Sequence, residues 1–158
     1  MKILSLDTST KGTGWALFIN GIYESSGVID DFKKVKDGEE RLELMVRKLL
    51  SEIGYWQPDV VVIEKDVVFG NMKVIDMLMK IIGSVYGYCK THDIFYYEFV
   101  PSEWRKYAKI QAFGRKREAF KEASIKYIKD ILNMEVTDDE ADAICIGLAY
   151  IKKMGGKG

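Results

Sequence analysis

A continuous run of branched apolar residues, "DVVVIEK" at residues 59–65, constrains the fold of this chain more than any other feature. A strand that is apolar at successive positions has no solvent-facing side, so it must be buried on both faces. Such strands occur in the middle of parallel sheets with a helix layer on each side. The run follows Pro58 and ends in an acid, Glu64. The pattern therefore predicts an α/β domain whose central strand ends in a carboxylate.

Four further strands are expected around this run. Residues 2–7 and 13–19 alternate as strands do, and Asn20-Gly21 is a strong hairpin signal before a third strand at 22–29. The last strand is "IFYYEFV", 94–100. Hairpins pair strands antiparallel and helical crossovers pair them parallel. The chain therefore predicts a mixed five-stranded sheet, three antiparallel strands then two parallel, with helices on both faces.

Apolar residues at helical spacing predict the segments between and after these strands. Asp37 is expected to cap the first helix, and Ser102 to cap a short helix that carries Trp104 and Tyr107. The expected helices cover residues 39–53, 71–90, the segment after Ser102, 115–132 and 137–153. We expect one domain over residues 1–153 and a flexible tail at 154–158.

Composition excludes several classes of protein. The 24 basic and 24 acidic residues cancel, so binding to a polyanion would depend on a local patch. One histidine, His92, and two distant cysteines, Cys89 and Cys145, do not form a zinc site. No apolar stretch approaches the roughly 20 residues that cross a bilayer. We therefore expect a cytoplasmic protein that does not interact with membranes.

Two acids end strands that are otherwise apolar. Asp7 closes the first strand and Glu64 closes the buried run, and a carboxylate at such a place costs free energy unless something compensates it. If the two strands are neighbours, the two carboxylates lie side by side. Each acid alone is equally well explained as a strand end that reaches solvent.

The stretch "TDDEADAI", residues 137–144, adds more acids at the start of the last helix. Thr137 and Glu140 form a capping box, and acids in the first turn interact favourably with the helix dipole. Those reasons do not explain Asp142, which begins the buried stripe and shares a face with Asp139. Four converging carboxylates, Asp7, Glu64, Asp139 and Asp142, would suit Mg²⁺ or Mn²⁺, and two such ions about 4 Å apart would clamp a phosphodiester.

Three segments resemble the motifs of RuvC-type Holliday-junction resolvases, in particular the compact phage-encoded branch. They are "LSLDTSTKGTGWALF", "QPDVVVIEK" and "DDEADAICIGLAY". The resemblance covers nearly the whole chain and implies an RNase H-like fold. It also implies a homodimeric, Mg²⁺-dependent endonuclease that acts on branched DNA, chiefly four-way junctions, by symmetric paired nicks.

The resemblance implies roles for individual residues. Asp7, Glu64, Asp139 and Asp142 would be catalytic and would hold two Mg²⁺ ions, with Mn²⁺ as a substitute, and metal-bound water would attack the phosphodiester. Asp138 stays open as an alternative to Asp139. No nucleotide cofactor is implied, and a phage-encoded protein would act in the host cytoplasm.

Basic and aromatic residues indicate where DNA would bind. Residues 101–130 hold nine Lys and Arg against four acids, and in "GRKR" Gly114 comes just before the start of the basic helix expected at 115–132. Lys121, Lys126 and Lys129 are better explained as a solvated helix face. Phe69 stands near the place where the resembling family carries an aromatic residue after its Glu. The candidate DNA-binding residues are Lys11, Phe69, Arg105, Phe113, Arg115, Lys116 and Arg117.

The segment 71–90 is apolar around most of its circumference and rich in Met, which favours an adaptable interface. A fully buried core helix is the alternative. For a two-fold dimer, the candidate interface residues are Met72, Ile75, Met79, Ile82 and Tyr86.

Other functions compete with junction resolution. A nuclease of the same fold would act on RNA/DNA hybrids or flaps, because fold does not determine substrate. "LDTSTKGTGW" is also similar to the phosphate-binding hairpin of actin-like and sugar-kinase ATPases, but that fold needs two domains. A DNA-binding module without catalysis is the last alternative, and the intact acids argue against it.

Overall fold

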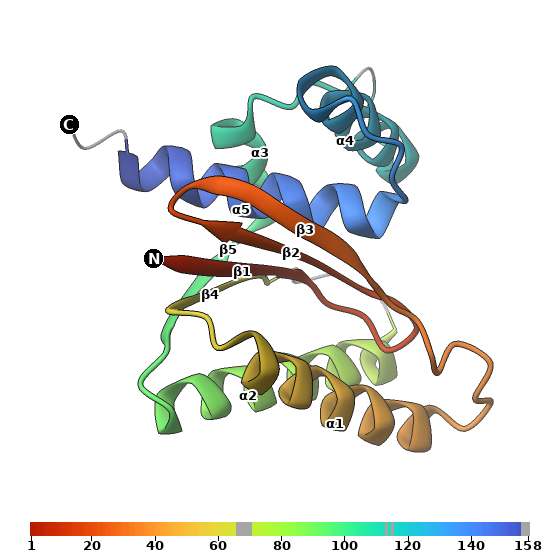
Figure 1. Ribbon diagram of the computed structural model, residues 1–158. Coiled ribbons are helices and arrows are strands. Elements are labelled where there is room, and N and C mark those ends of the chain that lie inside the picture. The colour runs from red at the N-terminus through yellow and green to blue at the C-terminus, as the bar shows by residue number, and fades with distance from the viewer. Residues whose placement is uncertain (66–70, 113, 115, 156–158) are drawn as a thin grey trace.

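The computed structural model describes residues 1–65, 71–112, 114 and 116–155 of the 158-residue chain. Its elements, shown in Figure 1, follow one another as β1 (Lys2–Asp7), β2 (Thr13–Ile19), β3 (Ile22–Ile29), α1 (Gly38–Trp56), β4 (Val60–Glu64), α2 (Met72–Thr91), β5 (Phe95–Phe99), α3 (Pro101–Ala108), α4 (Arg117–Leu132) and α5 (Asp138–Gly155). None of these helices is both long and apolar enough to span a bilayer.

The five strands form one mixed sheet in the order β3-β2-β1-β4-β5. β1 pairs antiparallel with β2, and β2 with β3, whereas β4 lies parallel to both β1 and β5. The turn between β2 and β3 has positive φ at both Asn20 and Gly21, as a type I′ hairpin requires. The predicted sheet, with three antiparallel strands followed by two parallel ones, is confirmed.

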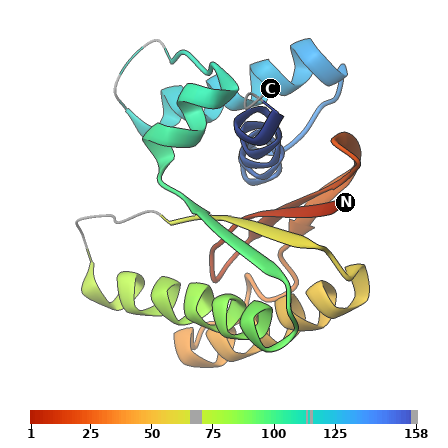
Figure 2. The same cartoon turned by 90° about the vertical axis from the view of Figure 1, so that its left-hand side faces the viewer.

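Helices cover both faces of the sheet, as Figures 1 and 2 show. α1 and α2 lie on one side, and α5 lies on the other with α3 and α4 around it. Alternate residues of each strand enter separate cores: Leu4 and Leu6 pack with α1 and α2, whereas Ile3 packs with α5. In β4 the residues from Val60 to Ile63 are all buried, which confirms a central strand with two apolar faces.

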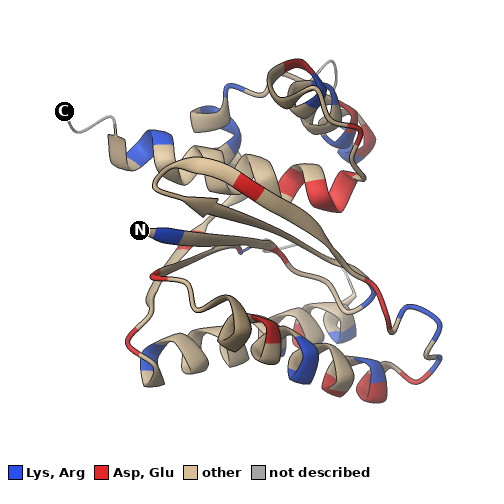
Figure 3. Cartoon of the chain, in the orientation of Figure 1, with Lys and Arg blue, Asp and Glu red and all other residues tan. Residues whose placement is uncertain are grey.

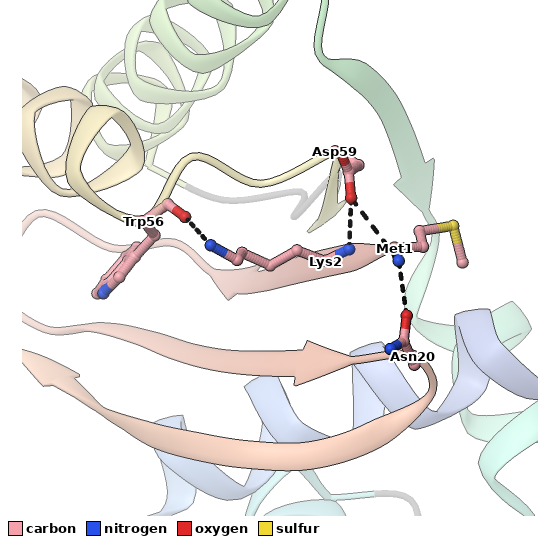
Figure 4. Close-up of polar contacts among 5 residues, drawn as sticks. All are labelled: Met1, Lys2, Asn20, Trp56 and Asp59. Atoms are coloured by element: carbon pink, nitrogen blue, oxygen red, sulfur yellow. Dashed lines mark hydrogen bonds and ion pairs between the residues drawn. The ribbon is translucent and has the colours of Figure 1, made fainter.

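The start of β1 is held on both sides by side chains and by the chain terminus. The terminal ammonium donates to Asn20 Oδ1 at 2.7 Å, and the Lys2 amide donates to Asp59 Oδ2 at 2.6 Å. Lys2 Nζ reaches the Trp56 carbonyl oxygen at 2.8 Å, as seen in Figure 4. These contacts join β1 to the β2–β3 turn and to the start of β4. They fix the register that brings Asp7 to the opposite edge of the sheet.

Some helix starts agree with the sequence and others correct it. Asp37 caps α1, since its Oδ1 accepts from the Glu40 amide at 2.8 Å. Ser102 is not a cap, because Pro101 occupies the first position of α3 and Val100 is the N-cap residue. Proline suits that position because it has no N–H to satisfy. The basic helix begins at Arg117 rather than at residue 115, and α5 continues to Gly155, so two residues of the expected tail are helical.

The expected capping box of α5 is only half formed. Thr137 Oγ1 accepts from the Glu140 amide at 3.4 Å. The Glu140 carboxylate accepts instead from Ser26 Oγ on β3, at 2.7 Å. This contact ties the first turn of α5 to the sheet.

Glycine lets α5 approach the sheet at the point where Asp7 lies. Gly14 pairs with Asp7, and a Cβ on Gly14 would stand 2.0 Å from the carbonyl oxygen of Asp139. One turn further along, Ser5 Oγ donates to the Ala143 carbonyl oxygen at 2.6 Å. The absence of a side chain at Gly14 therefore determines how close the acids of α5 come to β1.

We expect Gly14→Ala to lower the free energy of unfolding by about 1–3 kcal/mol or more, because the added methyl group overpacks backbone that cannot rotate away. Gly155→Ala at the end of α5 is the matched control. A Cβ at Gly155 meets nothing within 4 Å, so this variant should keep the free energy of unfolding within about 0.5 kcal/mol of the wild type. Urea unfolding of both variants measures the difference. Equal stability of the Gly14→Ala protein and the wild type would contradict the close approach.

Candidate active site

The carboxyl ends of β1 and β4 bring two acids to one edge of the sheet. In the parallel pairing Leu6 lies opposite Ile63, and the next residues along the two strands are Asp7 and Glu64. Their backbones are held by the ladders of the surrounding strands, and both side chains are half-buried. The predicted neighbourhood of these two acids is present in the structure.

The first turns of α5 add acids to the same edge. Asp139 Oδ2 lies 3.3 Å from the position that a Cβ on Gly12 would take, in the loop that follows β1. Asp142 lies one turn further into the helix. Figure 3 shows this acidic end of α5 against the sheet, with the charged residues of α4 beside it.

Mutual repulsion and burial alter the pKa values of these acids. The pKa of Asp7 is raised well above the usual aspartate value, first by burial and then by the charges of Glu64, Asp142 and Asp139. Burial also raises the pKa of Asp139, with help from the Asp138 charge. The charges of the other three predicted acids, Glu64, Asp139 and Asp142, therefore all act on Asp7.

Burial raises the pKa of Asp142 to about 6. The neighbouring Ser124 hydroxyl and the Arg105 and Lys121 charges oppose this rise. Asp142 Oδ1, Ser124 Oγ and Arg105 Nε are buried and have no hydrogen-bond partner among the described residues. Unsatisfied buried polar atoms are rare, so these three atoms, which belong to Asp142 and to two residues that act on it, are a candidate place for a bound group.

Asp138 has a different environment from that of Asp139. Lys121 Nζ donates to Asp138 Oδ2, and this hydrogen bond lowers the pKa of Asp138. A paired carboxylate of this kind is satisfied without any further ligand.

The set of oxygen donors fits a hard divalent cation. Carboxylate oxygens are the ligands that Mg²⁺ and Mn²⁺ prefer. Cations would also compensate the repulsion that raises the pKa of Asp7. Within the residues that the structure describes, no three acidic, histidine or cysteine side chains are already arranged to hold one ion.

A cavity of about 500 Å³ opens beside Asp7 and Glu64. Its walls come from the loop after β1, from α1, from the start of α2 and from α4, and include Lys11, Arg41, Asn71, Ile75 and Arg117. A second hollow of about 360 Å³ lies on the other side of Lys11 and is lined by Asp139, Asp138 and Lys33. A polyanion that entered this edge of the sheet would meet cations on both sides of the acids.

The predicted DNA-binding residues divide into three groups. Lys11 and Arg117 line the cavity, and the Arg117 charge opposes the rise in the pKa values of Asp7 and Asp139. Lys116 is exposed at the N-cap of α4, and Arg105 is half-buried beside Asp142. The remaining three lie outside the described residues: Phe69, Phe113 and Arg115.

The predicted interface residues of α2 differ in exposure. Met72 is 74% exposed and Tyr86 49% exposed, and Met79 is half-buried. Ile82 is 6% exposed within the core of the protomer, which leaves almost none of it for a partner. Ile75 lines the cavity at the acids.

Sequence reasoning missed several residues at the site. The sequence predicts a solvated Lys121, whereas in the structure Lys121 pairs with Asp138. Lys121 shares one face of α4 with Arg117 and Ser124, and this spacing in the sequence would have indicated that Lys121 lies at the site. Arg41 in the cavity wall donates to the Val35 carbonyl oxygen at 2.7 Å, and nothing in its local sequence indicates that contact. By contrast, Lys126 and Lys129 make surface ion pairs with Asp130 and Glu135, as expected of a solvated face.

Trp104 is the other missed residue. Its indole Nε1–H donates to Glu64 Oε2, although 40 residues separate the two. Only the packing of α3 beside the end of β4 brings them together.

Comparison with known proteins agrees with this architecture. The crossover junction endodeoxyribonuclease RuvC of Caldicellulosiruptor saccharolyticus is 24% identical over 156 residues, which cover 96% of this chain and 92% of that protein. Thermus thermophilus RuvC, solved with a Holliday junction substrate, superposes with a TM-score of 0.74 at 14% identity over 99% of this chain and 96% of the other. Fowlpox virus resolvase, solved with Holliday junction DNA, gives 0.67 at 22% identity over 98% and 99%.

These likenesses confirm the predicted RNase H-like fold. A family model described as DUF3882, Lactococcus phage M3 protein, matches residues 1–153 and so includes both the strand-end acids and the acidic start of α5. This chain therefore belongs to the DUF3882 family of Lactococcus phage M3 proteins.

Proposed function

We propose that this protein is a divalent-metal-dependent endonuclease that resolves four-way DNA junctions by paired nicks, in the cytoplasm of a phage-infected host. The observation that carries the proposal is the convergence of Asp7, Glu64, Asp139 and Asp142 at one edge of an RNase H-like sheet. The names of the relatives support the substrate, since two of the similar structures contain Holliday junction DNA.

Each part of the site has a role in this proposal. Asp7, Glu64, Asp139 and Asp142 would hold two Mg²⁺ ions, with Mn²⁺ as a substitute. Asp139 is preferred over Asp138 because Lys121 already satisfies Asp138. Bound ions would activate water for attack on the phosphodiester and stabilise the leaving oxygen.

Cations of the protein itself would hold the DNA backbone. Lys11 and Arg117 line the cavity beside the acids, and Lys116 stands exposed at the start of α4. Contacts of this type place the scissile phosphate without reading sequence. Arg105 lies beside Asp142, where its charge would act on the acids and on the phosphate together. We extend the proposed DNA contacts to Phe69, Phe113 and Arg115.

We also propose that two copies associate through α2. Met72, Met79 and Tyr86 lie on one side of this helix, and an exposed apolar stripe of this kind is typical of an interface. A two-fold dimer would present two equivalent sites to a junction whose arms are related by similar symmetry.

The function is tested with labelled four-way junction, linear duplex, flap and RNA/DNA hybrid, each in Mg²⁺ or in EDTA. We expect paired nicks in opposite strands of the junction in Mg²⁺ and none in EDTA. Glu64→Gln should lower the rate of junction cleavage by more than about 100-fold, because a residue that binds the ions directly matters more than an outer partner. It should leave junction affinity in EDTA unchanged. Glu98→Gln on the neighbouring strand is the matched control and should retain activity.

Other results would favour other functions. Cleavage of the hybrid or the flap alone would support a different nuclease on the same fold, and ATP hydrolysis without DNA would support an ATPase. Junction binding without cleavage in any divalent ion would leave a DNA-binding module. A loss of junction affinity as large as the loss of cleavage in Glu64→Gln would contradict the role given to Glu64.

We expect the metal-free protein to lose stability as the pH rises from about 4 to about 6. The folded-state pKa values of Asp7, Asp139 and Asp142 are raised, to about 6 for Asp142, so in this window the folded protein binds more protons than the unfolded chain. The stability that these protonated acids contribute is therefore fully present below their unfolded-state pKa values. It is lost as the pH rises through their folded-state pKa values. Urea unfolding in EDTA across this range measures the slope.

Asp142→Asn removes one source of that loss. In EDTA at pH 8 it should stabilise the protein by up to about 3 kcal/mol, and the gain should vanish below pH 4. Asp138→Asn is the control of opposite sign, because its carboxylate is stabilised by Lys121. Mg²⁺ should raise the melting temperature of the wild type more than that of Asp142→Asn. A wild type whose stability is indifferent to Mg²⁺ would contradict the metal site.

The dimer is tested by sedimentation velocity. Met79→Glu should shift the protein from dimer to monomer, because a carboxylate buried at an apolar interface has no partner. Tyr55→Ser on α1 is the control, since Tyr55 is 82% exposed on a different helix. Ile75 is unsuitable for this test because it lines the cavity. A wild type that sediments as a monomer at all concentrations would contradict the proposed interface.

A further inference from the structure

Trp104 joins the core of the protein to one of the acids of the candidate active site. Its side chain is fully buried in the cluster between α5 and the sheet. Its Nε1–H nevertheless donates to Glu64 Oε2 at the end of β4. Tryptophan in a core normally finds a partner for this N–H. Here the partner is a carboxylate that the proposed function uses.

The chemistry of indole suits this contact. The indole N–H donates one hydrogen bond, accepts none and carries no charge. It therefore fixes the orientation of the carboxylate and leaves its negative charge in place. A lysine or arginine at the same position would neutralise that charge. A carboxylate has about four lone-pair positions, so the hydrogen bond from Trp104 is compatible with a role as a metal ligand.

The helix that carries Trp104 is itself firmly held. Glu103 Oε1 accepts from Lys153 Nζ of α5 at 2.5 Å, and the same ammonium donates to Tyr97 Oη of β5 at 2.5 Å. That ammonium also lies 5.4 Å from the centre of the Tyr107 ring. Glu103 thus joins α3 to α5 through Lys153 and to β5 through Tyr97, whose Oη donates to Glu103 Oε1 at 3.3 Å.

Arg105 also contacts the ring of Trp104. Its guanidinium carbon lies 5.0 Å from the ring of Trp104 and 4.3 Å from the ring of Phe120 on α4. A cation close to aromatic rings is favourable when it is partly desolvated. Successive residues of α3 therefore approach two acids of the site, Trp104 at Glu64 and Arg105 at Asp142.

We propose that Trp104 is a positioning residue, which holds the Glu64 carboxylate in the orientation needed to bind a divalent cation. This inference rests on the proposed nuclease function. It assigns to α3 a part in the site that does not involve contact with DNA. Outer partners that orient a metal ligand typically contribute about 10–100-fold to metal affinity or activity.

The hydrogen bond is tested first in protein free of metal and DNA. The chain has three tryptophans, Trp15, Trp56 and Trp104, so a ¹⁵N-labelled sample shows three indole N–H resonances. We expect the Trp104 resonance to be the downfield one and the most protected from hydrogen exchange. Glu64→Ala should shift it upfield and remove the protection, with little effect on the other two. An unchanged Trp104 resonance in this variant would overturn the proposal.

The positioning role is tested by Trp104→Phe, which keeps an aromatic ring and removes the donor. We expect Mn²⁺ affinity, measured by calorimetry without DNA, and the junction-cleavage rate in Mg²⁺ to fall by about 10–100-fold. Junction affinity in EDTA should stay the same. Trp15→Phe is the matched control, because Trp15 packs against Trp56 on the opposite face of the sheet, and it should retain both values.

Two further measurements keep the test decisive. If Trp104→Phe does not fold, 3-benzothienylalanine at this position preserves the shape of the ring and places sulfur where the N–H stood. In a Glu64→Ala background, the loss of the donor should cause no further loss of Mn²⁺ affinity, because both changes remove one interaction. Additive losses, or a donor-free variant with wild-type Mn²⁺ affinity, would overturn the positioning role. Failure of the wild type to bind Mn²⁺ would overturn the nuclease proposal instead, and the indole resonances would still report the contact.

Discussion

The close contact between the first turns of α5 and the β1–β2 pair is the constraint on which the rest of the site depends. The backbone register of β1 and β4 brings Asp7 and Glu64 together. The strand pairing accounts for only these two of the four acids. The acids of α5 join them only because Gly14 has no side chain where the Asp139 carbonyl lies. Ser5 then fastens the next turn through the Ala143 carbonyl oxygen. Small residues at the contact thus determine the spacing of four carboxylates.

This spacing is unfavourable for the protein by itself. Burial and like charges raise the pKa of Asp7, and burial raises the pKa of Asp142. The repulsion is offset only in part, because Lys121 is paired with Asp138 and Arg117 acts from the wall of the cavity. The folded protein is therefore destabilised at the place where we propose that a ligand binds, and raised pKa values of this kind are typical of functional sites. The two ends of β1 therefore differ, since the Met1 end has satisfied contacts and the Asp7 end has repulsion.

Sequence patterns predicted the parts of the fold that depend on local periodicity. The strands, the hairpin at Asn20-Gly21, the buried run before Glu64 and the cap at Asp37 all follow from the spacing and chemistry of adjacent residues. The same reasoning placed Asp7 and Glu64 together, because parallel strands end at a common edge. It mistook Ser102 for a cap because Pro101 and Ser102 both favour a helix start, and the proline takes the first position.

The contacts that sequence reasoning missed join segments far apart in the chain. Trp104 meets Glu64 and Lys121 meets Asp138 through the packing of α3 and α4 on α5, which no local pattern records.

Those contacts also bear on how DNA would be selected. The chain has no net charge, and two cations near the acids, Lys121 and Arg105, already have partners within the protein. Attraction to phosphate alone would therefore be weak and unselective. In the proposed function, selectivity for a four-way junction must then come mainly from geometry, through two sites held at a fixed separation by the α2 interface.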